Sequence, residues 1–244
     1  ALRRGRRLLL LPGSRMPEAL GNLERLLACL PQLPAGPATA SAAAGGDGQR
    51  LGLAEAPAQR ASSAVAESPR EPGALTLLLA CGSRPSASDL QAPLRAAGFS
   101  TVPPQDPAWQ AASACGAQAL WRRGRIDLWL GAGRFATWAG WAELGLATAG
   151  TATEQLVGLG IAALSLPGPG PQFQAGFARR QSRLLGGAVH PCRTPAELQR
   201  ALQELLADPA ERGRLGRIGR RRMGPAGASE RLAALIDRQL LGGA

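Results

Sequence analysis

Several residue types are rare or absent in this sequence of 244 residues. It contains no lysine and no tyrosine, one histidine and four cysteines. Without lysine it cannot form a P-loop, whose lysine contacts nucleotide phosphates. One histidine excludes a metal site of several imidazoles, and cysteines at positions 29, 81, 115 and 192 lie too far apart for paired metal ligands or a disulfide framework. We therefore expect reduced thiols and no bound metal.

The single histidine, His190, follows the apolar pair Ala188-Val189 and precedes Pro191, which predicts a strand end. A Ser-His-Asp triad would have to use this one residue. We expect His190 to have a structural role, or to contact the edge of a base, rather than to act in catalysis.

Long apolar runs are also absent. No run approaches the roughly 18 residues of a membrane span, and the start lacks the apolar core of a secretory signal. Hydrophobic residues make up 45% and charged residues 18% of the chain, which is typical of a globular domain. These features predict a soluble chain.

Acidic residues are outnumbered, which leaves a formal net charge of +11. The aromatic residues are not interleaved with the charges, and no helix-turn-helix, zinc-finger or RNA-recognition signature is present, so we expect no specific nucleic-acid partner. The densest basic cluster lies between Arg212 and Arg222. A solvated helical face is the commoner explanation of such a cluster, and attraction to anionic lipid head groups or to a polyanionic ligand is the alternative.

Apolar and amphipathic segments alternate along most of the chain. This alternation predicts an α/β fold, a Rossmann-like parallel sheet with helices on both faces. Predicted strands include 75–81, 126–130, 144–149 and 161–166, and predicted helices include 17–30, 87–97, 109–123, 172–185, 195–207, 209–222 and 229–241. Residues 31–73 are rich in Ala, Gly, Pro, Ser and Gln without periodicity, which predicts a flexible low-complexity insertion.

The most informative segment begins at Gly150, between two predicted strands. Its residues are Gly150, Thr151, Ala152, Thr153, Glu154 and Gln155. Small residues at a helix start present free backbone N–H groups and a partial positive charge, which suits a phosphate. Glu154 and Gln155 would then reach sugar hydroxyls. The alternative is that these residues only cap the helix and permit close packing.

A second turn of the same kind follows the strand Leu8–Leu11. Its residues Gly13, Ser14 and Arg15 precede a helix that contains Glu18. Two such turns in one α/β chain suggest a shared anionic ligand. Arg15 has an alternative partner in Glu18, three residues further on.

A third loop, Gly168-Pro169-Gly170-Pro171-Gln172-Phe173, follows the predicted strand 163–167. Ligands gather at the carboxyl ends of strands in open parallel sheets, so all three loops are predicted to converge on one crevice. Gln174 and Gln181 compete with Gln172 for a role there, and Gln172 could instead cap the next helix.

Four segments carry a resemblance to a known family. They are Leu11–Arg15 with Glu18, Ala149–Gln155, Leu166–Phe173 running on to Gln181–Gly186, and Arg222–Ser229. In this order they resemble the C-terminal, nucleotide-sugar-binding half of lipid-A-disaccharide synthases and lipid-A-disaccharide synthase-like proteins, which are glycosyltransferases of the two-domain GT-B fold. The resemblance spans nearly the whole chain.

The resemblance implies a domain plan. Residues 1–30 would form the first strand and helix of the donor domain, 31–73 the insertion, 74–227 the rest of the donor domain, and 228–244 a C-terminal helix. A GT-B enzyme needs two domains and this chain has room for about one. We therefore expect a fragment whose N-terminal acceptor domain, with the general base, is missing.

The resemblance also implies an activity. It is inverting hexosyl transfer from a nucleotide diphosphate sugar of the UDP-N-acetylglucosamine type to a lipid-like acceptor, with no cofactor or metal, by a cytoplasmic protein peripheral to the inner membrane. Gln172 would meet the donor sugar. The family places its ribose-binding Glu where this chain has Gln155, and here the acid is Glu154, which puts the identity of the ribose partner in doubt. Alternatives are a non-catalytic binding module with the same fold and a nucleotide-sugar epimerase-like enzyme.

Overall fold

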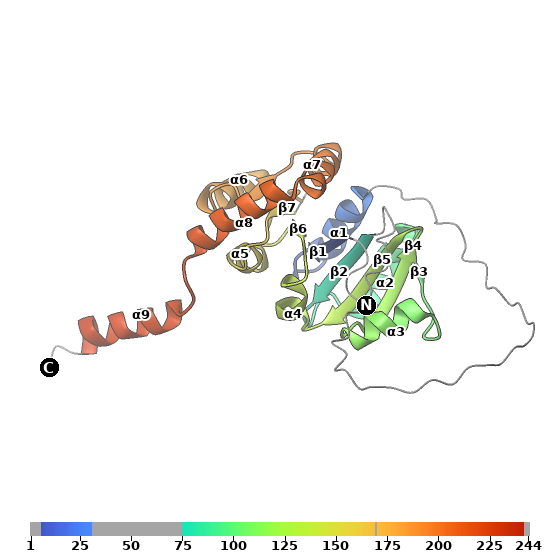
Figure 1. Cartoon of the computed structure of the whole chain (residues 1–244), viewed down its shortest axis with the longest axis horizontal. Coiled ribbons are helices and arrows are strands. Elements are labelled where there is room, and N and C mark those ends of the chain that lie inside the picture. Colours follow the sequence, from blue (N-terminus) through green and yellow to red (C-terminus); the bar gives the residue numbers. More distant parts are fainter. Residues whose placement is uncertain (1–5, 31–74, 169, 242–244) are drawn as a thin grey trace, which may run out of the picture.

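A computed structural model describes residues 6–30, 75–168 and 170–241. The predicted insertion 31–73 lies outside the described residues. The described part is a single eight-stranded sheet with helices packed on both of its faces (Figure 1). The predicted fold class is therefore confirmed.

The strands lie in the order β3-β4-β5-β2-β1-β6-β7-β8. Their bounds are β1 (Arg6–Leu11), β2 (Leu75–Cys81), β3 (Ser100–Thr101), β4 (Ala119–Arg123), β5 (Ile126–Ala132), β6 (Leu144–Ala147), β7 (Ala163–Ser165) and β8 (Val189–Pro191). The six strands from β5 to β8 are parallel, and β4 is antiparallel to both of its neighbours. Strands β2 and β5 follow β1 on one side of it. Strands β6, β7 and β8 follow on the other side of β1.

Two helical layers cover the sheet. The helices are α1 (Glu18–Ala28), α2 (Ala87–Ala96), α3 (Pro107–Ala114), α4 (Phe135–Ala139), α5 (Thr151–Gly158), α6 (Ala175–Leu184), α7 (Pro195–Ala207), α8 (Pro209–Met223) and α9 (Ala228–Ile236), which continues into the π-helical turn η1 (Asp237–Leu241). Apolar residues of α1, α2 and α7 share one core with one face of the sheet, and those of α3, α4 and α5 share the other. None of the described helices is long and apolar enough to cross a membrane.

Strand β1 shows why the sheet lies between two helical layers. Leu8 and Leu10 belong to one core and Leu9 and Leu11 to the other, since successive side chains of a strand point to opposite faces. A continuous apolar run is therefore the pattern of a strand buried on both faces.

One predicted element is wrong. Residues 109–123, expected as one helix, form the end of α3 and the whole of β4. Gly116 lies between them with φ of +86°, a conformation that ends a helix and that glycine adopts without strain. Strand β4 then pairs with β5, with Trp121 opposite Leu128 and buried, so tertiary pairing overrides the local helical pattern. The sheet is consequently mixed and not wholly parallel.

Helix α8 packs closely on α5 through glycines. A Cβ on Gly216 would meet the backbone carbonyl oxygen of Gly160, and a Cβ on Gly219 would meet Val157. Gly213, one turn earlier on α8, meets only the end of the Arg217 side chain, at 3.5 Å. Both Gly216 and Gly219 are buried, and Gly213 is exposed.

These contacts predict opposite effects of one substitution at two positions of α8. Gly216→Ala should lower the free energy of unfolding by about 1–3 kcal/mol, because the backbone of Gly160 cannot move aside as a side chain would. Gly213→Ala should raise it by up to about 1 kcal/mol, because alanine favours the helix and its Cβ would make only an ordinary contact with the end of the flexible Arg217 side chain. Urea denaturation of both variants measures the difference, and equal effects at the two positions would contradict the described packing.

Candidate functional site

The strand order reverses direction beside β1, and we call the place at the carboxyl ends of β1 and β6 the candidate crevice. The connections from β1 and from β6 leave the sheet in opposite directions, and open α/β sheets bind ligands at this point, outside the carboxyl ends of the strands. The turns at these two strand ends are the ones that the sequence analysis singled out. The N–H of Thr148 donates to the carbonyl oxygen of Leu11 at 2.8 Å, so the two turns adjoin.

The turn after β1 depends on a glycine. Gly13 has φ of +92°, and a Cβ there would lie 3.6 Å from the carbonyl oxygen of Thr148. Ser14 and Arg15, which follow, are exposed. The ion pair between Arg15 and Glu18 that the sequence analysis gave as an alternative is absent among the described residues, and the Arg15 side chain has no other hydrogen bond there, so its guanidinium is available to an anion.

Helix α5 begins at the crevice without a side-chain cap. The N–H groups of Thr153 and Glu154 donate to the carbonyl oxygen of Gly150 at 3.0 and 3.2 Å. Those of Thr151 and Ala152 have no acceptor within the described part of the chain, as expected for the first turn of a helix. These two N–H groups and the positive end of the helix dipole could bind a phosphate.

The two threonines of this turn have different environments. Thr153 is fully buried, and its Oγ1 donates to the carbonyl oxygen of Ala149 at 2.6 Å. Its side chain therefore stabilises the start of α5. Thr151 is exposed, so its hydroxyl remains available to a ligand.

The rotation of α5 separates Glu154 from Gln155. Glu154 is half-buried and accepts a hydrogen bond from Nε2 of Gln181 on α6 at 3.3 Å, whereas Gln155 is exposed. Adjacent residues lie about 100° apart around a helix, so only one of them can face a given partner. The structure places Glu154 against α6 and Gln155 in solvent; which of them meets a ribose stays a prediction.

Gln181, which the sequence analysis named only as a competitor of Gln172, lies on α6 against the start of α5. Its side chain is 3% exposed, and Nε2 donates both to Glu154 and, at 3.2 Å, to the carbonyl oxygen of Gly150. Both partners are acceptors, which fixes the orientation of the amide. Its Oε1 is buried without a partner in the described chain. The sequence could have indicated this role, because Gln181 is a polar residue on the buried face of an amphipathic helix.

The loop after β7 is held against α1. Nη1 of Arg25 donates to the carbonyl oxygen of Pro167 at 2.5 Å, and buried Asn22 lies where a Cβ on Gly168 would be. Nδ2 of Asn22 also donates to the carbonyl oxygen of Pro12 at 3.1 Å. Asn22 therefore joins the loop after β7 to the turn after β1.

Gln172 lies on this loop, at the same edge of the sheet, and is exposed. The loop closes through a hydrogen bond of 2.9 Å from the N–H of Gly168 to the carbonyl oxygen of Phe173. Gln174, one of the two competitors, precedes α6 and caps no backbone group. The role of Gln172 stays a prediction.

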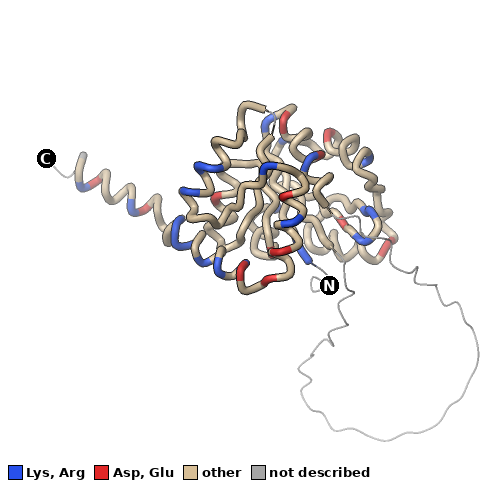
Figure 2. Tube along the Cα trace, turned by 90° about the horizontal axis from the view of Figure 1, so that it is seen from above, with Lys and Arg blue, Asp and Glu red and all other residues tan. Residues whose placement is uncertain are grey.

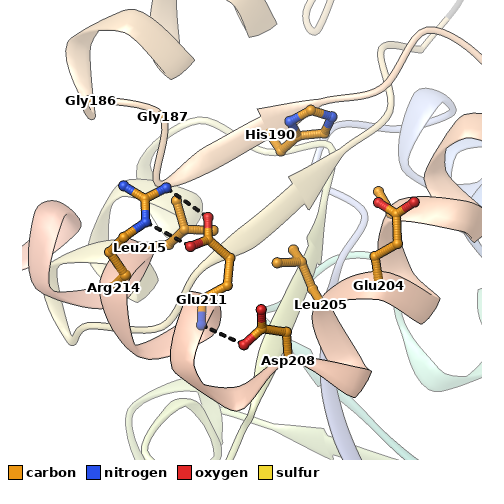
Figure 3. A pocket seen from close by; sticks show the side chains of 10 residues that line it. Gly186, Gly187, His190, Glu204, Leu205, Asp208, Glu211, Arg214 and Leu215 are labelled. Carbon is orange, nitrogen blue, oxygen red and sulfur yellow. Dashed lines mark hydrogen bonds and ion pairs between the residues drawn. The ribbon is translucent and has the colours of Figure 1, made fainter.

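Two hollows lie away from the crevice. One, of about 380 Å³, is lined by His190, Glu204, Asp208 and Glu211 among others (Figure 3). Asp208 accepts from the N–H of Glu211 at 2.8 Å, and Glu211 pairs with Arg214 at 2.6 Å, so these carboxylates stabilise the first turns of α8. His190 lies on strand β8 as predicted and is exposed; β8 is an edge strand, separated from β6 by β7.

The cysteines are free thiols in the described chain. Burial raises the pKa of Cys29 and of Cys81 to about 11 and that of Cys192 to about 12. These thiols therefore stay protonated near neutral pH and are poor nucleophiles and metal ligands.

Comparison with known proteins defines the fold. No protein-family model and no curated protein match the sequence. The structure is similar to sucrose-phosphate synthase from Thermosynechococcus elongatus, with a TM-score of 0.50 and 17% identity, over 100% of this chain and 47% of that chain. It is also similar to the glycotransferase of kitacinnamycin, with a TM-score of 0.47 and 18% identity, over 97% of this chain and 44% of that chain. The chain thus spans about half the length of these structures, and at such identities the first likeness shows the fold alone.

The contacts of Gln181 predict a pH-dependent defect. Gln181→Glu should place a carboxylate beside Glu154 and the carbonyl oxygen of Gly150, where the amide donated hydrogen bonds. These neighbours should raise the pKa of the new carboxyl group in the folded variant above the value of about 4.3 that it has in the unfolded chain. The free energy of unfolding should therefore fall as the pH rises from 5 to 8.

Gln181→Met serves as the uncharged control for this prediction. It should lose roughly 1–3 kcal/mol because the hydrogen bonds from Nε2 of Gln181 to Glu154 and to the carbonyl oxygen of Gly150 are removed, and this loss should be the same across that pH range. Urea denaturation at several pH values measures both. If the free energy of unfolding of Gln181→Glu depended on pH no more than that of Gln181→Met, the predicted environment of residue 181 would be wrong.

Proposed function

We propose that this chain is the donor-binding domain of a GT-B glycosyltransferase related to the lipid-A-disaccharide synthases, and that it holds a nucleotide diphosphate sugar of the UDP-N-acetylglucosamine type. The observation that carries this proposal is the meeting of the turn after β1 with the start of α5 beside the switch point of the sheet. The likeness in fold to one half of sucrose-phosphate synthase is compatible with it.

The diphosphate would lie against the first turn of α5. The N–H groups of Thr151 and Ala152 are donors without acceptors in the described chain, and Arg15 supplies a positive charge from the neighbouring turn. Donors that are already in place stabilise the charge that develops on a leaving nucleoside diphosphate without reorganisation. This arrangement needs no metal ion to neutralise the phosphates.

The remaining contacts divide between two elements. Glu154 or Gln155 would accept hydrogen bonds from ribose hydroxyls, and Gln172 would contact the sugar from the loop after β7. Gln181 donates a hydrogen bond to Glu154, whereas the exposed side chain of Gln155 has no partner among the described residues. The ribose could therefore meet either an oriented carboxylate or a neutral amide.

In the proposed transfer an acceptor hydroxyl attacks the anomeric carbon of the sugar. A bond forms between the hydroxyl oxygen and that carbon, the bond from the carbon to the phosphate oxygen breaks, and the electron pair leaves with the nucleoside diphosphate. The hydroxyl proton passes to a base, which we assign to a separate acceptor domain that would complete the enzyme. Attack from the opposite side inverts the anomeric configuration.

The test is calorimetric titration of the chain with UDP, UDP-N-acetylglucosamine and ADP. The proposal expects uridine nucleotides to bind more tightly than ADP, and Thr151→Ala to weaken them because a hydroxyl donor is lost. Gln172→Ala should remove the gain in affinity that the sugar adds while leaving UDP binding unchanged. Equal binding of UDP and ADP would overturn the assigned donor class, and absence of binding would favour a non-catalytic module.

Arg15 gives a separate prediction. Arg15→Ala should raise the Kd for UDP about tenfold or more, since a hydrogen bond to a charged group contributes roughly 1.5–3 kcal/mol. Its melting temperature should stay within about 1 °C of wild type, because an exposed side chain without a partner contributes little to stability. Arg95→Ala, which removes an exposed arginine of α2, is the matched control and should leave the Kd unchanged. A UDP affinity of Arg15→Ala equal to that of the control would exclude Arg15 from the site.

A further inference from the structure

One acidic side chain near the candidate crevice is partly buried and has no partner. Figure 2 shows acidic residues interspersed among basic ones over the domain, and most of the acidic side chains that the structure describes form hydrogen bonds or ion pairs. Within the described part of the chain, those that form neither are Glu18, Glu24, Glu204, Glu230 and Asp237. All of them are exposed except Glu18, which is half-buried. Partial burial of a carboxylate without a donor costs free energy, so its position needs an explanation.

Glu18 lies in the first turn of α1, on the face that holds the loop after β7. Three residues of this face, Glu18, Asn22 and Arg25, follow one another at helical spacing and lie against that loop. Asn22 and Arg25 donate hydrogen bonds to carbonyl oxygens of the turns beside them. Oε1 of Glu18 lies 3.1 Å from the position of a Cβ on Gly170, and an ionised carboxylate can only accept hydrogen bonds. Glu18 therefore touches the loop without being bonded to it.

The usual roles of an acidic residue at a helix start do not account for this position. No side-chain hydrogen bond caps the start of α1. The partial positive charge of the helix start attracts a carboxylate in solvent as well as one packed against a loop. Arg15, three residues earlier, is the expected partner of an ion pair, yet no ion pair joins it to Glu18 within the described residues. Each of the two charges is therefore available to a different part of one ligand.

The loop that Glu18 contacts also reaches the start of α5, where the diphosphate is proposed to bind. Phe173, at the end of the loop, is buried, and its ring centroid lies 5.3 Å from that of Phe177 on α6. Cζ of Phe177 lies 3.6 Å from the position of a Cβ on Gly150, the residue before α5. Gln172, which we propose to contact the sugar, belongs to the same loop. Glu18 therefore lies on the side of the crevice where the proposed sugar would be.

We infer that Glu18 binds hydroxyl groups of the donor sugar and so contributes to the choice of sugar. This inference rests on the proposed function. An ionised carboxylate accepts hydrogen bonds at both oxygens, and neighbouring ring hydroxyls can donate to it together. A cationic ligand group would be repelled by Arg15, which lies within one turn of the helix. The described residues gather no group of three or more metal-binding side chains, so the carboxylate of Glu18 is better matched to an uncharged hydroxyl donor than to a metal ion.

The test is calorimetric titration of the full chain with UDP and with UDP-N-acetylglucosamine. The Kd for UDP divided by the Kd for UDP-N-acetylglucosamine measures the gain in affinity that the sugar adds. Glu18→Ala should lower this ratio about tenfold or more, because hydrogen bonds to a charged group are lost. The Kd for UDP alone should stay the same or fall, because a negative charge near the diphosphate is removed. Glu18→Gln keeps an acceptor without the charge, so its ratio should lie between those of wild type and Glu18→Ala.

Glu24→Ala is the matched control, because it removes an exposed acidic side chain from the same helix, and it should leave both dissociation constants unchanged. A purely structural role of Glu18 would weaken both ligands equally and leave the ratio as in wild type. An unchanged ratio in Glu18→Ala, with UDP still bound, would overturn the role of Glu18 and leave the proposed nucleotide site standing. Absence of UDP binding to the wild-type chain would overturn both.

Discussion

The pairing of β1 with β2 on one side and β6 on the other is the constraint on which the rest of the structure depends. All four leucines of Leu8–Leu11 are buried, two in each of the two cores, so this strand joins both helical layers. Removal of one fully buried leucine side chain from such a core typically costs about 2–5 kcal/mol, a large part of the stability of a domain this size. The same pairing brings the turn after β1 beside the turn after β6.

Close contacts at glycines occur in the candidate crevice as well as in the packing of α8. Gly168 and Gly170 let the loop after β7 lie against Asn22 and Glu18 of α1. Gly13 lets the chain turn beside Thr148. Small residues in these turns are therefore needed for folding whether or not a phosphate binds, and the same backbone geometry leaves N–H groups free at the start of α5. Fold and candidate site share one set of glycines.

The two edges of the sheet carry different chemistry. At the carboxyl edge, helix starts present N–H groups and Arg15, which suit a compact anion. At the opposite edge, arginines of α8 lie at helix ends. Arg220 donates to the carbonyl oxygen of Leu159, and the side chains of Arg221 and Arg222 have no hydrogen bond or ion pair among the described residues. The helix dipole explains the position of Arg220 at the end of α5 but not the positions of Arg221 and Arg222. This difference separates the arginines that stabilise the fold from those available to a partner.

The sequence alone determined the α/β class and most strand and helix positions, and it located the turns at Gly13 and Gly150, because continuous apolar runs and small-residue turns are local patterns. It did not predict β4, whose helical pattern around Trp121 yields to pairing with β5. The strand order, and with it the meeting of the two turns, was decided only by the tertiary structure. So were the separation of Glu154 from Gln155 and the contact of Gln181 with Gly150, because the rotation of α5 depends on packing between helices far apart in the chain.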